Sequence, residues 1–514
     1  MEPTATYPCP LDAFDRAWPL HDVQQSRRIE AAAAAALPPH ALMQRAGLSV
    51  ARLALATAPH ARRIWVAAGP GNNGGDGLEA AMQLRRAGKD VWVNLTADPS
   101  KLPADAAASF RRAADAGVAI GEATAAPVDV DLAIDALIGL GATREPEGAV
   151  AMLVRAINAT VCPRLAIDLP SGLSADSGAP LGPLVVRATH TLALLTLKPG
   201  LFTAMGREQA GAVWFDDLGC GAESDQVSPR AQLGDADSAR LLRPPRGHAG
   251  HKGGYGDVIT VGGAPGMSGA LALAARAALA GGAGRVFACA LDPKMPTHDA
   301  LAPELMWRPG LWHDDPTTWQ DATVICGCGG GNAVREALPV LLSRSARLVL
   351  DADALNAIAT DTTLQSLLTA RASRGRATVL TPHPLEAARL LALQGADGLA
   401  RADRVQANRM AAAQTLAQRF DCTVLLKGSG SVIAAPRRTP VINPTGNARL
   451  AGAGTGDVLA GWLGGLWSAS AASGAMADAF VVARAAAYWH GAAAQYGDAA
   501  TPLTASALLA ALAA

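Results

Sequence analysis

Short apolar runs alternate with helical segments along most of this chain, in two separate series. The first series has apolar runs at residues 63–68, 91–95, 132–138 and 164–168, and the second begins at residues 257–263. Strands that alternate with helices form parallel sheets, because each helix carries the chain back to the start of the next strand. We therefore predict an α/β protein with two doubly wound sheets, whose ligands bind beyond the carboxyl ends of the strands.

The two series are separated by a polar stretch. We predict a first domain over residues 1–222, a linker over 223–234 and a second domain over 235–514. The first domain should open with a pair of helices at residues 27–37 and 41–57. Further strands of the second series are expected at residues 285–290, 322–326, 347–351, 377–381 and 423–427.

Composition excludes some classes of partner. The 44 basic and 44 acidic side chains leave no net charge, and aromatic residues make up only 4% of the chain. Neither favours nucleic-acid binding, which depends on basic surfaces and base-stacking aromatics. Residues 458–477 carry no charge, but they are rich in Gly and Ser and directly follow a glycine-rich loop. We expect a buried helix there and no membrane contact.

The cysteines indicate a reducing compartment. There are seven, an odd number, and only Cys326 and Cys328 are close; one intervening residue is too short for usual zinc or redox spacing. We interpret both as reduced loop residues. Residues 1–10 lack the basic and apolar regions of a secretory signal. We therefore predict a cytoplasmic protein.

A glycine-rich loop is the most informative feature of the first half. Residues 69–77 read Gly-Pro-Gly-Asn-Asn-Gly-Gly-Asp-Gly, between a predicted strand and a helix predicted at 78–87. Glycines let a phosphate approach the backbone, and helix N-terminal amides favour anions. The spacing is not the dinucleotide fingerprint. The Asn and Asp oxygens suit a hard cation or ribose hydroxyls, although a plain strand–helix turn is the alternative.

Two further aspartates lie near the ends of predicted strands. Asp168 precedes Leu-Pro-Ser-Gly and could act as a general acid or base. Asp135 precedes Gly139-Leu140-Gly141. Each could instead only cap the following turn.

Together these loops resemble the NAD(P)H-hydrate epimerase family, the YjeF N-terminal domain. The matching segments within residues 23–215 are Glu30, 42–47, 71–77, 135–139 and 167–172. The resemblance implies a Rossmann-like three-layer fold, Asp168 as catalytic acid or base, and K⁺ held by Asn73, Asp135 and Ser171. It also implies substrate contacts from Asn72, Asn73, Gly74, Gly75, Asp76, Gly139, Leu140, Gly141, Ala142, Thr143 and Asp168. Leu78-Glu79 departs from the apolar or aromatic pair expected after the loop.

A second glycine-rich run dominates the other half. Residues 447–461 combine several glycines with Thr455 and Asp457 before a helix. Backbone amides at such a helix start can form an anion hole for a transferring phosphoryl group. Asp457 could take a proton from a hydroxyl nucleophile. The alternative is a tight turn with Asp457 as a helix cap.

This run resembles the ribokinase-like superfamily and, within it, the ADP/ATP-dependent NAD(P)H-hydrate dehydratases, the YjeF C-terminal domain. The matching segments within residues 235–510 are 251–257, 262–263, 268–270, 303–306, 350–356, 381–386 and 425–431. The resemblance implies a ribokinase-like three-layer α/β fold, Asp457 as catalytic base, Mg²⁺, and ADP or ATP as co-substrate. It implies substrate contacts from Ala270, Gly331, His383 and Asp457, and nucleotide contacts from Lys427, Gly428, Ser429, Gly430, Ser431 and Gly456.

Two positions depart from the dehydratase pattern. Gly327-Cys328-Gly329-Gly330-Gly331 stands where the family usually has Gly-Pro-Gly-Leu-Gly, and Leu385 stands where it usually has Gly. The first departure should loosen a substrate-side loop, and the second should change the turn after His383.

The resemblances imply a bifunctional enzyme that epimerises R and S hydrated NADH and NADPH and dehydrates the S epimer with ADP or ATP. The sequence leaves the choice of nucleotide open, although we favour ADP. We also expect a homo-oligomer. The alternative is a ribokinase-like small-molecule kinase with a non-catalytic N-terminal binding module.

Overall fold

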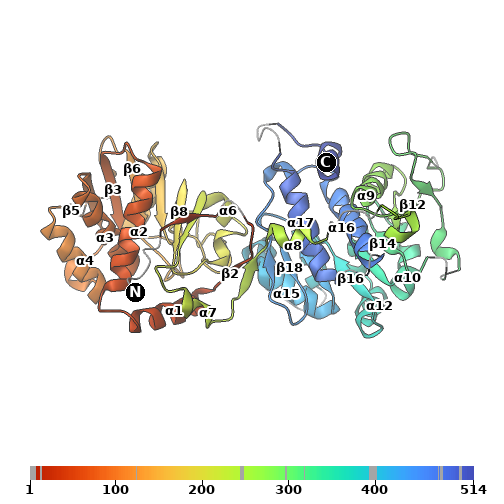
Figure 1. Cartoon of the computed structure of the whole chain (residues 1–514), viewed down its shortest axis with the longest axis horizontal. Coiled ribbons are helices and arrows are strands. Elements are labelled where there is room, and N and C mark those ends of the chain that lie inside the picture. The colour runs from red at the N-terminus through yellow and green to blue at the C-terminus, as the bar shows by residue number, and fades with distance from the viewer. Residues whose placement is uncertain are drawn as a thin grey trace. The chain divides into compact units, whose positions relative to one another are not determined.

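The structure, a computed structural model, describes residues 7–11, 14–122, 124–242, 248–295, 298–315, 317, 319–392, 402–472, 474, 478–496 and 501–514. The chain divides into two compact units, which are described separately (Figure 1). Unit 1 comprises Met1–Ala13 and Trp18–Ala231, and unit 2 comprises Phe14–Ala17 and Gln232–Ala514.

Unit 1 contains a twisted sheet with the strand order β1-β9-β8-β7-β6-β3-β4-β5. All neighbours are parallel except β1 and β9. Its strands are β1 (Cys9–Pro10), β3 (Arg63–Ala68), β4 (Asp90–Leu95), β5 (Ala119–Gly121), β6 (Leu132–Ala136), β7 (Arg164–Ile167), β8 (His190–Leu194) and β9 (Ala212–Asp216), and β2 (Trp18–Leu20) is a further short strand near the N-terminus.

Helices cover both faces of this sheet (Figure 1). They are α1 (Val23–Ala35), α2 (Ala41–Thr57), α3 (Asn72–Arg86), α4 (Ala104–Asp115), α5 (Gly148–Ala159), α6 (Gly206–Gln209) and α7 (Gly221–Asp225). Side chains of a strand alternate between faces. On β3, Val66 therefore packs in a core with α1 to α4, whereas Trp65 packs in a second core with α5. Unit 1 is a three-layer, Rossmann-like α/β fold, as predicted.

Unit 2 contains a larger sheet in which strands follow the order β13-β12-β11-β14-β15-β16-β17-β18-β19-β10. Neighbours from β13 to β17 are parallel, and β18 is antiparallel to both β17 and β19. The strands are β10 (Ala231–Leu233), β11 (Asp257–Gly262), β12 (Arg285–Ala290), β13 (Met306–Trp307), β14 (Thr323–Cys326), β15 (Arg347–Leu350), β16 (Ala377–Leu380), β17 (Thr423–Leu426), β18 (Val432–Ala434) and β19 (Val441–Ile442).

Two helical layers enclose the sheet of unit 2. One core joins the sheet to α9 (Ser268–Ala280), α16 (Thr455–Ala472), α17 (Ala479–Ala493) and α18 (Ala505–Ala513). The remaining helices are α8 (Ala236–Arg240), α10 (Val334–Arg344), α11 (Ala352–Ala359), α12 (Thr362–Ser373), α13 (Pro384–Ala392), α14 (Ala402–Ala407) and α15 (Arg409–Phe420). Among them α10, α12 and α15 contact the strands. This is the predicted three-layer α/β architecture.

The uncharged segment at residues 458–477 lies largely within α16. Most side chains of α16 are buried, including Trp462 and Trp467, so the helix packs inside unit 2. Residues 473 and 475–477 of that segment lie outside the described residues. None of the helices in the described part of the chain has the length and apolar character that a membrane span requires.

The observed elements differ from the predicted ones in several places. The glycine-rich stretch predicted as a loop is largely helical, because α3 already begins at Asn72. The strands β5, β8 and β9 of unit 1 and the short strands β1, β2, β10, β13, β18 and β19 were not predicted. Residues 223–234, predicted as a linker, include the end of α7 and β10, which pairs with β19.

Candidate active sites

A large cavity opens at the carboxyl edge of the sheet in unit 1. The chain reverses its winding direction between the neighbouring strands β3 and β6, which is where α/β sheets form ligand crevices. The cavity has a volume of about 960 Å³. Its lining includes every predicted substrate residue except two glycines, namely Asn72, Asn73, Asp76, Gly139, Leu140, Gly141, Ala142, Thr143 and Asp168.

The two remaining glycines, Gly74 and Gly75, permit close packing behind the cavity. A Cβ atom on Gly74 would lie 2.0 Å from the carbonyl oxygen of Gly69, and one on Gly75 would meet Met43 at 2.7 Å. The first turn of α3 can therefore lie against β3 and α2 only without side chains here. As a result, Asn72, Asn73 and Asp76 project from the start of a helix, where backbone amides favour anions.

The three predicted potassium ligands lie on adjoining segments. Ser171 donates from its backbone nitrogen to Asp135 Oδ2 at 2.8 Å and from its hydroxyl to Asp135 Oδ1 at 2.6 Å. Asp135 is fully buried, and burial raises its carboxyl pKa to about 6. The buried Nδ2 atom of Asn73 has no hydrogen-bond partner among the described residues, and its side chain packs against Gly139.

These residues fit a monovalent cation by the chemistry of their donors. They offer carboxylate, hydroxyl and amide oxygens, which are the ligands of hard cations. A cation would also offset the burial of the Asp135 charge, which otherwise is costly. The Nδ2 atom of Asn73 has no hydrogen-bond partner among the described residues, so protein contacts do not satisfy all polar atoms of this side chain.

Asp168 follows β7 and faces the cavity. Its φ angle of 67° lies in the left-handed region, which Asp tolerates better than most residues. The side chain forms an ion pair through Oδ1 with Lys198, and Oδ1 also accepts from the backbone nitrogen of Leu194 at 3.2 Å. Lys198 was not predicted. It lies 30 residues further along the chain, and nothing in the local sequence links it to Asp168.

Other carboxyl groups line the same cavity, and two of them, Glu30 and Asp76, have raised pKa values. Burial, followed by the charge of Asp168, raises the pKa of Glu30 on α1. Burial, followed by the charges of Asp168 and Glu30, raises the pKa of Asp76 well above its usual value. The charge of the buried Lys198 therefore lies close to Asp168 and Glu30, and Asp76 interacts with both of these acids. Glu30 belonged to the family match but had no predicted role.

The departure at Glu79 has a local explanation. Its carboxylate is buried, and Oε2 accepts from Arg112 Nη2 at 2.6 Å and from Ser109 Oγ at 3.2 Å. A buried acid of this kind is tolerated because it is paired and hydrogen-bonded. Glu79 therefore supports the packing of α3 on α4 and does not line the cavity.

Unit 2 has an equivalent reversal between β11 and β14. The loop after β14 contains Gly327, Gly329 and Gly331, whose φ angles are 121°, 57° and 51°. A Cβ on Gly327 would lie 1.9 Å from the carbonyl oxygen of Asp351. A Cβ on Gly329 would lie 2.9 Å from Ala270, so the predicted substrate residues Ala270 and Gly331 belong to one neighbourhood. Cys326 is the last residue of β14, as the strand predicted at residues 322–326 implied, and only its interpretation as a loop residue was wrong.

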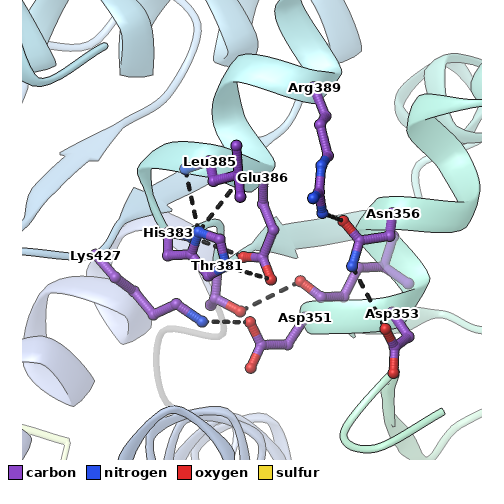
Figure 2. Close-up of polar contacts among 10 residues, drawn as sticks. Asp351, Asp353, Asn356, Thr381, His383, Leu385, Glu386, Arg389 and Lys427 are labelled. Carbon is purple, nitrogen blue, oxygen red and sulfur yellow. Dashed lines mark hydrogen bonds and ion pairs between the residues drawn. The ribbon is translucent and has the colours of Figure 1, made fainter. Parts of the chain in front are cut away.

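A lysine–aspartate pair also lies at this edge. Lys427, directly after β17, donates to Asp351 Oδ1 at 2.5 Å, and the carboxyl of Asp351 is buried (Figure 2). Although burial opposes the charge on Lys427, the carboxylates of Asp351 and Glu386 raise its pKa. A Cβ on Gly456 would lie 3.4 Å from Lys427 Nζ. The glycine-rich helix start is therefore in contact with this pair.

Asp457 lies beside the pair on the first turn of α16. Burial, and then the charge of Asp351, raises its carboxyl pKa to about 6. The ligand atoms of Asp457, Asp351 and Cys328 all lie within 4.8 Å of one another. Burial, together with both carboxylates, raises the thiol pKa of Cys328 well above its usual value. Cys328 thus adjoins the predicted base as a neutral thiol.

His383 is held by the start of α13 (Figure 2). Its Nδ1 accepts from the backbone nitrogen of Leu385 at 3.1 Å, and Nε2 lies 3.2 Å from Glu386 Oε1. Burial raises the pKa of Glu386 to about 7. Leu385 lies in the first helical turn without positive φ, so no glycine is needed there. Sequence reasoning missed Glu386 as the partner of His383, although its position three residues later is typical of a helix start.

The predicted nucleotide-binding residues form a hairpin loop. Lys427 to Ser431 connect β17 to its antiparallel partner β18, and Gly428 and Gly430 have φ angles of 136° and 60°. Arg409 is buried behind the loop and donates to the carbonyl oxygens of Leu426 and Lys427. The loop is thus held from behind, while the Lys427 side chain reaches Asp351.

Comparisons with known proteins agree with both halves. A family model described as NAD(P)H-hydrate dehydratase matches residues 249–512, and one described as YjeF-related protein N-terminus matches residues 39–200. A bifunctional NAD(P)H-hydrate repair enzyme from Escherichia coli (strain K12) is 33% identical over 467 residues, covering 89% of this chain and 86% of the relative. One from Gloeobacter violaceus is 36% identical over 465 residues, covering 86% and 87%.

Among solved structures, an ADP/ATP-dependent NAD(P)H-hydrate dehydratase from Bacillus subtilis, co-crystallized with ATP/Mg²⁺, matches with a TM-score of 0.42 and 27% identity. The match covers 53% of this chain and 94% of that chain. The two family models and the relatives cover both units of the present chain, and the model described as NAD(P)H-hydrate dehydratase matches its second half. The chain belongs to the family of bifunctional NAD(P)H-hydrate repair enzymes.

Proposed function

We propose that unit 1 interconverts the R and S epimers of hydrated NADH and NADPH, and that unit 2 dehydrates the S epimer. The observation that carries this proposal is the presence, in one chain of this family, of a carboxyl group at the ligand-binding edge of each sheet. Asp168 faces the cavity of unit 1, and Asp457 lies at the anion-favouring start of α16. One half thereby supplies the epimer that the other half consumes.

In unit 1, Asp168 is the proposed acid and base. Epimerisation requires loss and return of the hydroxyl on ring carbon six, or an equivalent ring opening. A carboxyl group at the cavity wall can give a proton to the departing hydroxyl and take it back when water returns. Asn73, Asp135 and Ser171 are the proposed ligands of K⁺. A bound K⁺ would supply positive charge to the cavity wall.

Substrate binding in unit 1 is assigned to two segments of the cavity wall. The start of α3 contributes Asn72 to Asp76, and the loop after β6 contributes Gly139 to Thr143. Helix N-terminal amides suit the pyrophosphate of the substrate. Glycine in the second segment leaves room for the ring system.

In unit 2, Asp457 is the proposed base that takes the proton of the ring hydroxyl. The hydroxyl oxygen then attacks the terminal phosphorus of the nucleotide, whose bond to the bridging oxygen breaks. The phosphorylated hydroxyl next leaves as inorganic phosphate, and loss of a ring proton restores the double bond. ATP would yield ADP and phosphate, and ADP would yield AMP and phosphate.

The nucleotide and substrate are assigned to separate loops of unit 2. Lys427 to Ser431 and Gly456 are the proposed nucleotide contacts, and Ala270, Gly331, His383 and Asp457 are the proposed substrate contacts. Mg²⁺ is expected with the nucleotide, where it neutralises phosphate charge. Preference for ADP, a cytoplasmic location and a homo-oligomeric state stay predictions.

The test is recovery of dihydronicotinamide absorbance from a mixture of hydrated NADH epimers. ADP, ATP or neither is added with Mg²⁺ and K⁺. Complete recovery, faster than spontaneous epimer exchange, is expected with one nucleotide. Recovery of only the S share would contradict the epimerase assignment. A stable phosphorylated product without recovery would favour the alternative small-molecule kinase.

A further inference from the structure

Lys198 is buried beside Asp168 in the cavity wall of unit 1. It is 1% exposed, and its ammonium group forms an ion pair with Asp168 Oδ1. Its Nζ atom also donates to the carbonyl oxygen of Leu194 at 2.8 Å. The backbone nitrogen of Leu194 returns a hydrogen bond to the same Oδ1 atom at 3.2 Å. These contacts connect the end of β8 to the residue that follows β7.

The contacts distinguish the two oxygens of the Asp168 carboxylate. Oδ1 receives both Lys198 and Leu194, whereas Oδ2 has no hydrogen bond to any residue in the described part of the chain. Asp168 lines the cavity, and its side chain remains 11% exposed. Oδ2 is therefore the oxygen left for a ligand.

We infer that Lys198 is a positioning residue of the epimerase, which tethers Oδ1 of Asp168 so that Oδ2 exchanges the proton with the substrate. This inference rests on the proposed function of unit 1. Proton transfer requires the acid or base within hydrogen-bond reach of the reacting atom. A carboxylate with one oxygen fixed offers the other at a defined place, which a freely rotating side chain does not.

Several other ionisable groups lie near Lys198 and Asp168. Glu30 on α1 and His21 in the segment before α1 interact with Lys198, and Asp76 on α3 interacts with Asp168, Glu30 and Asp105. Burial and Lys198 lower the pKa of His21, so this ring adds no competing positive charge near neutral pH. Three carboxyl groups near one another disfavour a shared ionised state. The ion pair places the ammonium group of Lys198 against Asp168 rather than against Glu30 or Asp76.

A purely structural role is a weaker account of this pair. Replacing a buried ion pair by apolar side chains of similar volume is often neutral or stabilising. Stability alone therefore does not explain a lysine and an aspartate in a cavity wall. The test must nevertheless separate positioning from folding, because removing one partner leaves the other charge uncompensated.

The first experiment compares Lys198→Gln with the wild-type chain in the epimer-exchange assay. We expect kcat to fall at least about tenfold, a part of the 10²–10⁴-fold that acid–base groups contribute, while KM changes little. Lys198→Arg, which keeps a charged donor, should restore part of the rate. Dehydration of purified S epimer, which depends on unit 2, should stay at the wild-type rate.

Lys89→Gln is the matched control. Lys89 is a partly buried lysine of unit 1 whose Nζ donates to the carbonyl oxygen of Ala61 at 2.6 Å, and it does not line the cavity. Its replacement should leave epimer exchange unchanged. A similar loss in both variants would overturn the positioning role and indicate general destabilisation.

The second experiment is a double-mutant cycle with Asp168→Asn. If Lys198 acts through Asp168, then Lys198→Gln should cause no further loss in kcat once Asp168→Asn is present. Removing both charges together also avoids an uncompensated buried group, so the double variant should keep the thermal stability of unit 1. Independent, multiplicative losses would overturn the inference.

The pH dependence supplies a readout that folding does not move. Without the nearby ammonium, ionisation of a buried carboxyl is less favourable, so the acid side of the Lys198→Gln rate profile should shift to higher pH. An unshifted profile would contradict the inference. If the wild-type chain itself fails to accelerate epimer exchange, the proposed function of unit 1 fails. If the wild-type chain is active and Lys198→Gln exchanges epimers at the same rate, only the positioning role of Lys198 fails.

Discussion

Both units place a buried lysine–aspartate pair at the carboxyl edge of a parallel sheet, but the two pairs hold different carboxylates. In unit 1, Lys198 is bonded to Asp168, the proposed catalytic group itself. In unit 2, Lys427 is bonded to Asp351, and the proposed base Asp457 lies beside that pair. A lysine–aspartate pair thus includes the proposed catalytic carboxyl group in unit 1, whereas in unit 2 it lies next to that group.

The difference matches the two kinds of chemistry. An epimerase must run in both directions, and a tethered carboxylate with one free oxygen serves proton loss and proton return alike. A base for phosphoryl transfer must take a proton near neutral pH. Asp457 forms no ion pair with any described residue, and burial and Asp351 raise its pKa to about 6, which brings it close to that range.

The strongest test of this comparison is Asp457→Asn. Removing the base should lower the dehydratase kcat by about 10²–10⁴-fold, because a positioned acid–base group contributes that much. Epimer exchange should be unchanged, since it depends on unit 1. Both rates can be followed by chromatographic separation of the two epimers and the restored dinucleotide.

Asp361→Asn is the control for that variant. Asp361 caps α12 through its side chain and lies outside the site, and Asn caps helices equally well. It should retain the wild-type dehydratase rate. An Asp457→Asn variant as active as this control would remove Asp457 from the mechanism and with it the contrast between the units.

A second test asks whether Asp351 depends on Lys427 for its burial. Lys427→Met leaves a carboxylate that is 2% exposed without its cation, which should destabilise unit 2 by about 3–5 kcal/mol. The double variant Lys427→Met with Asp351→Asn should recover most of this stability but not the activity. Urea denaturation, with the exposed Lys294→Gln as control, measures the stability of the single and the double variant. The dehydration assay measures their activity. A single variant as stable as the control would show that the pair is not coupled.

The strands were predictable from sequence, but the pairs were not. Residues 285–290 form a strand at the predicted bounds, because an apolar run between turn residues carries a local signal. Asp168 could be singled out because it ends a predicted strand, and Asp457 because it lies at the start of a predicted helix. Lys198 and Lys427 acquire their partners only when parallel strands bring distant segments to one edge, 30 and 76 residues apart.

The start of α3 shows the opposite limit. Its first six residues, Asn-Asn-Gly-Gly-Asp-Gly, have poor helix propensity and were therefore expected to form a loop. Tertiary packing overrides propensity here, because Gly74 and Gly75 allow backbone contacts that no other residue would. Local composition singled out a segment that lines the cavity of unit 1, but the predicted loop conformation was wrong.

Potassium should affect only unit 1. If Asn73, Asp135 and Ser171 hold the ion, replacing KCl by tetramethylammonium chloride at equal ionic strength should slow epimer exchange by on the order of tenfold and leave dehydration unchanged. Bound ligand also stabilises the folded state, so the melting temperature of unit 1 should rise with KCl. Asp135→Asn should abolish this rise. Equal sensitivity of both activities would contradict the assignment.

The smallest effect concerns Cys328, whose thiol is hydrogen-bonded to Asp457 and lowers its carboxyl pKa, against the larger effect of burial. With that pKa at about 6, Asp457 takes up a proton as the pH falls through 6, so dehydratase kcat/KM should drop about tenfold per pH unit below it.

Cys328→Ala removes a weak hydrogen-bond donor. It should shift the acid limb of the kcat/KM profile to higher pH by less than about one pH unit. Cys328→Ser should keep the wild-type limb, and Cys326→Ala, a buried thiol within β14, should not shift it. A downward shift in Cys328→Ala would mean that the thiol opposes ionisation of the base, and Asp457 would then owe its proton affinity to Cys328 as well as to burial and Asp351.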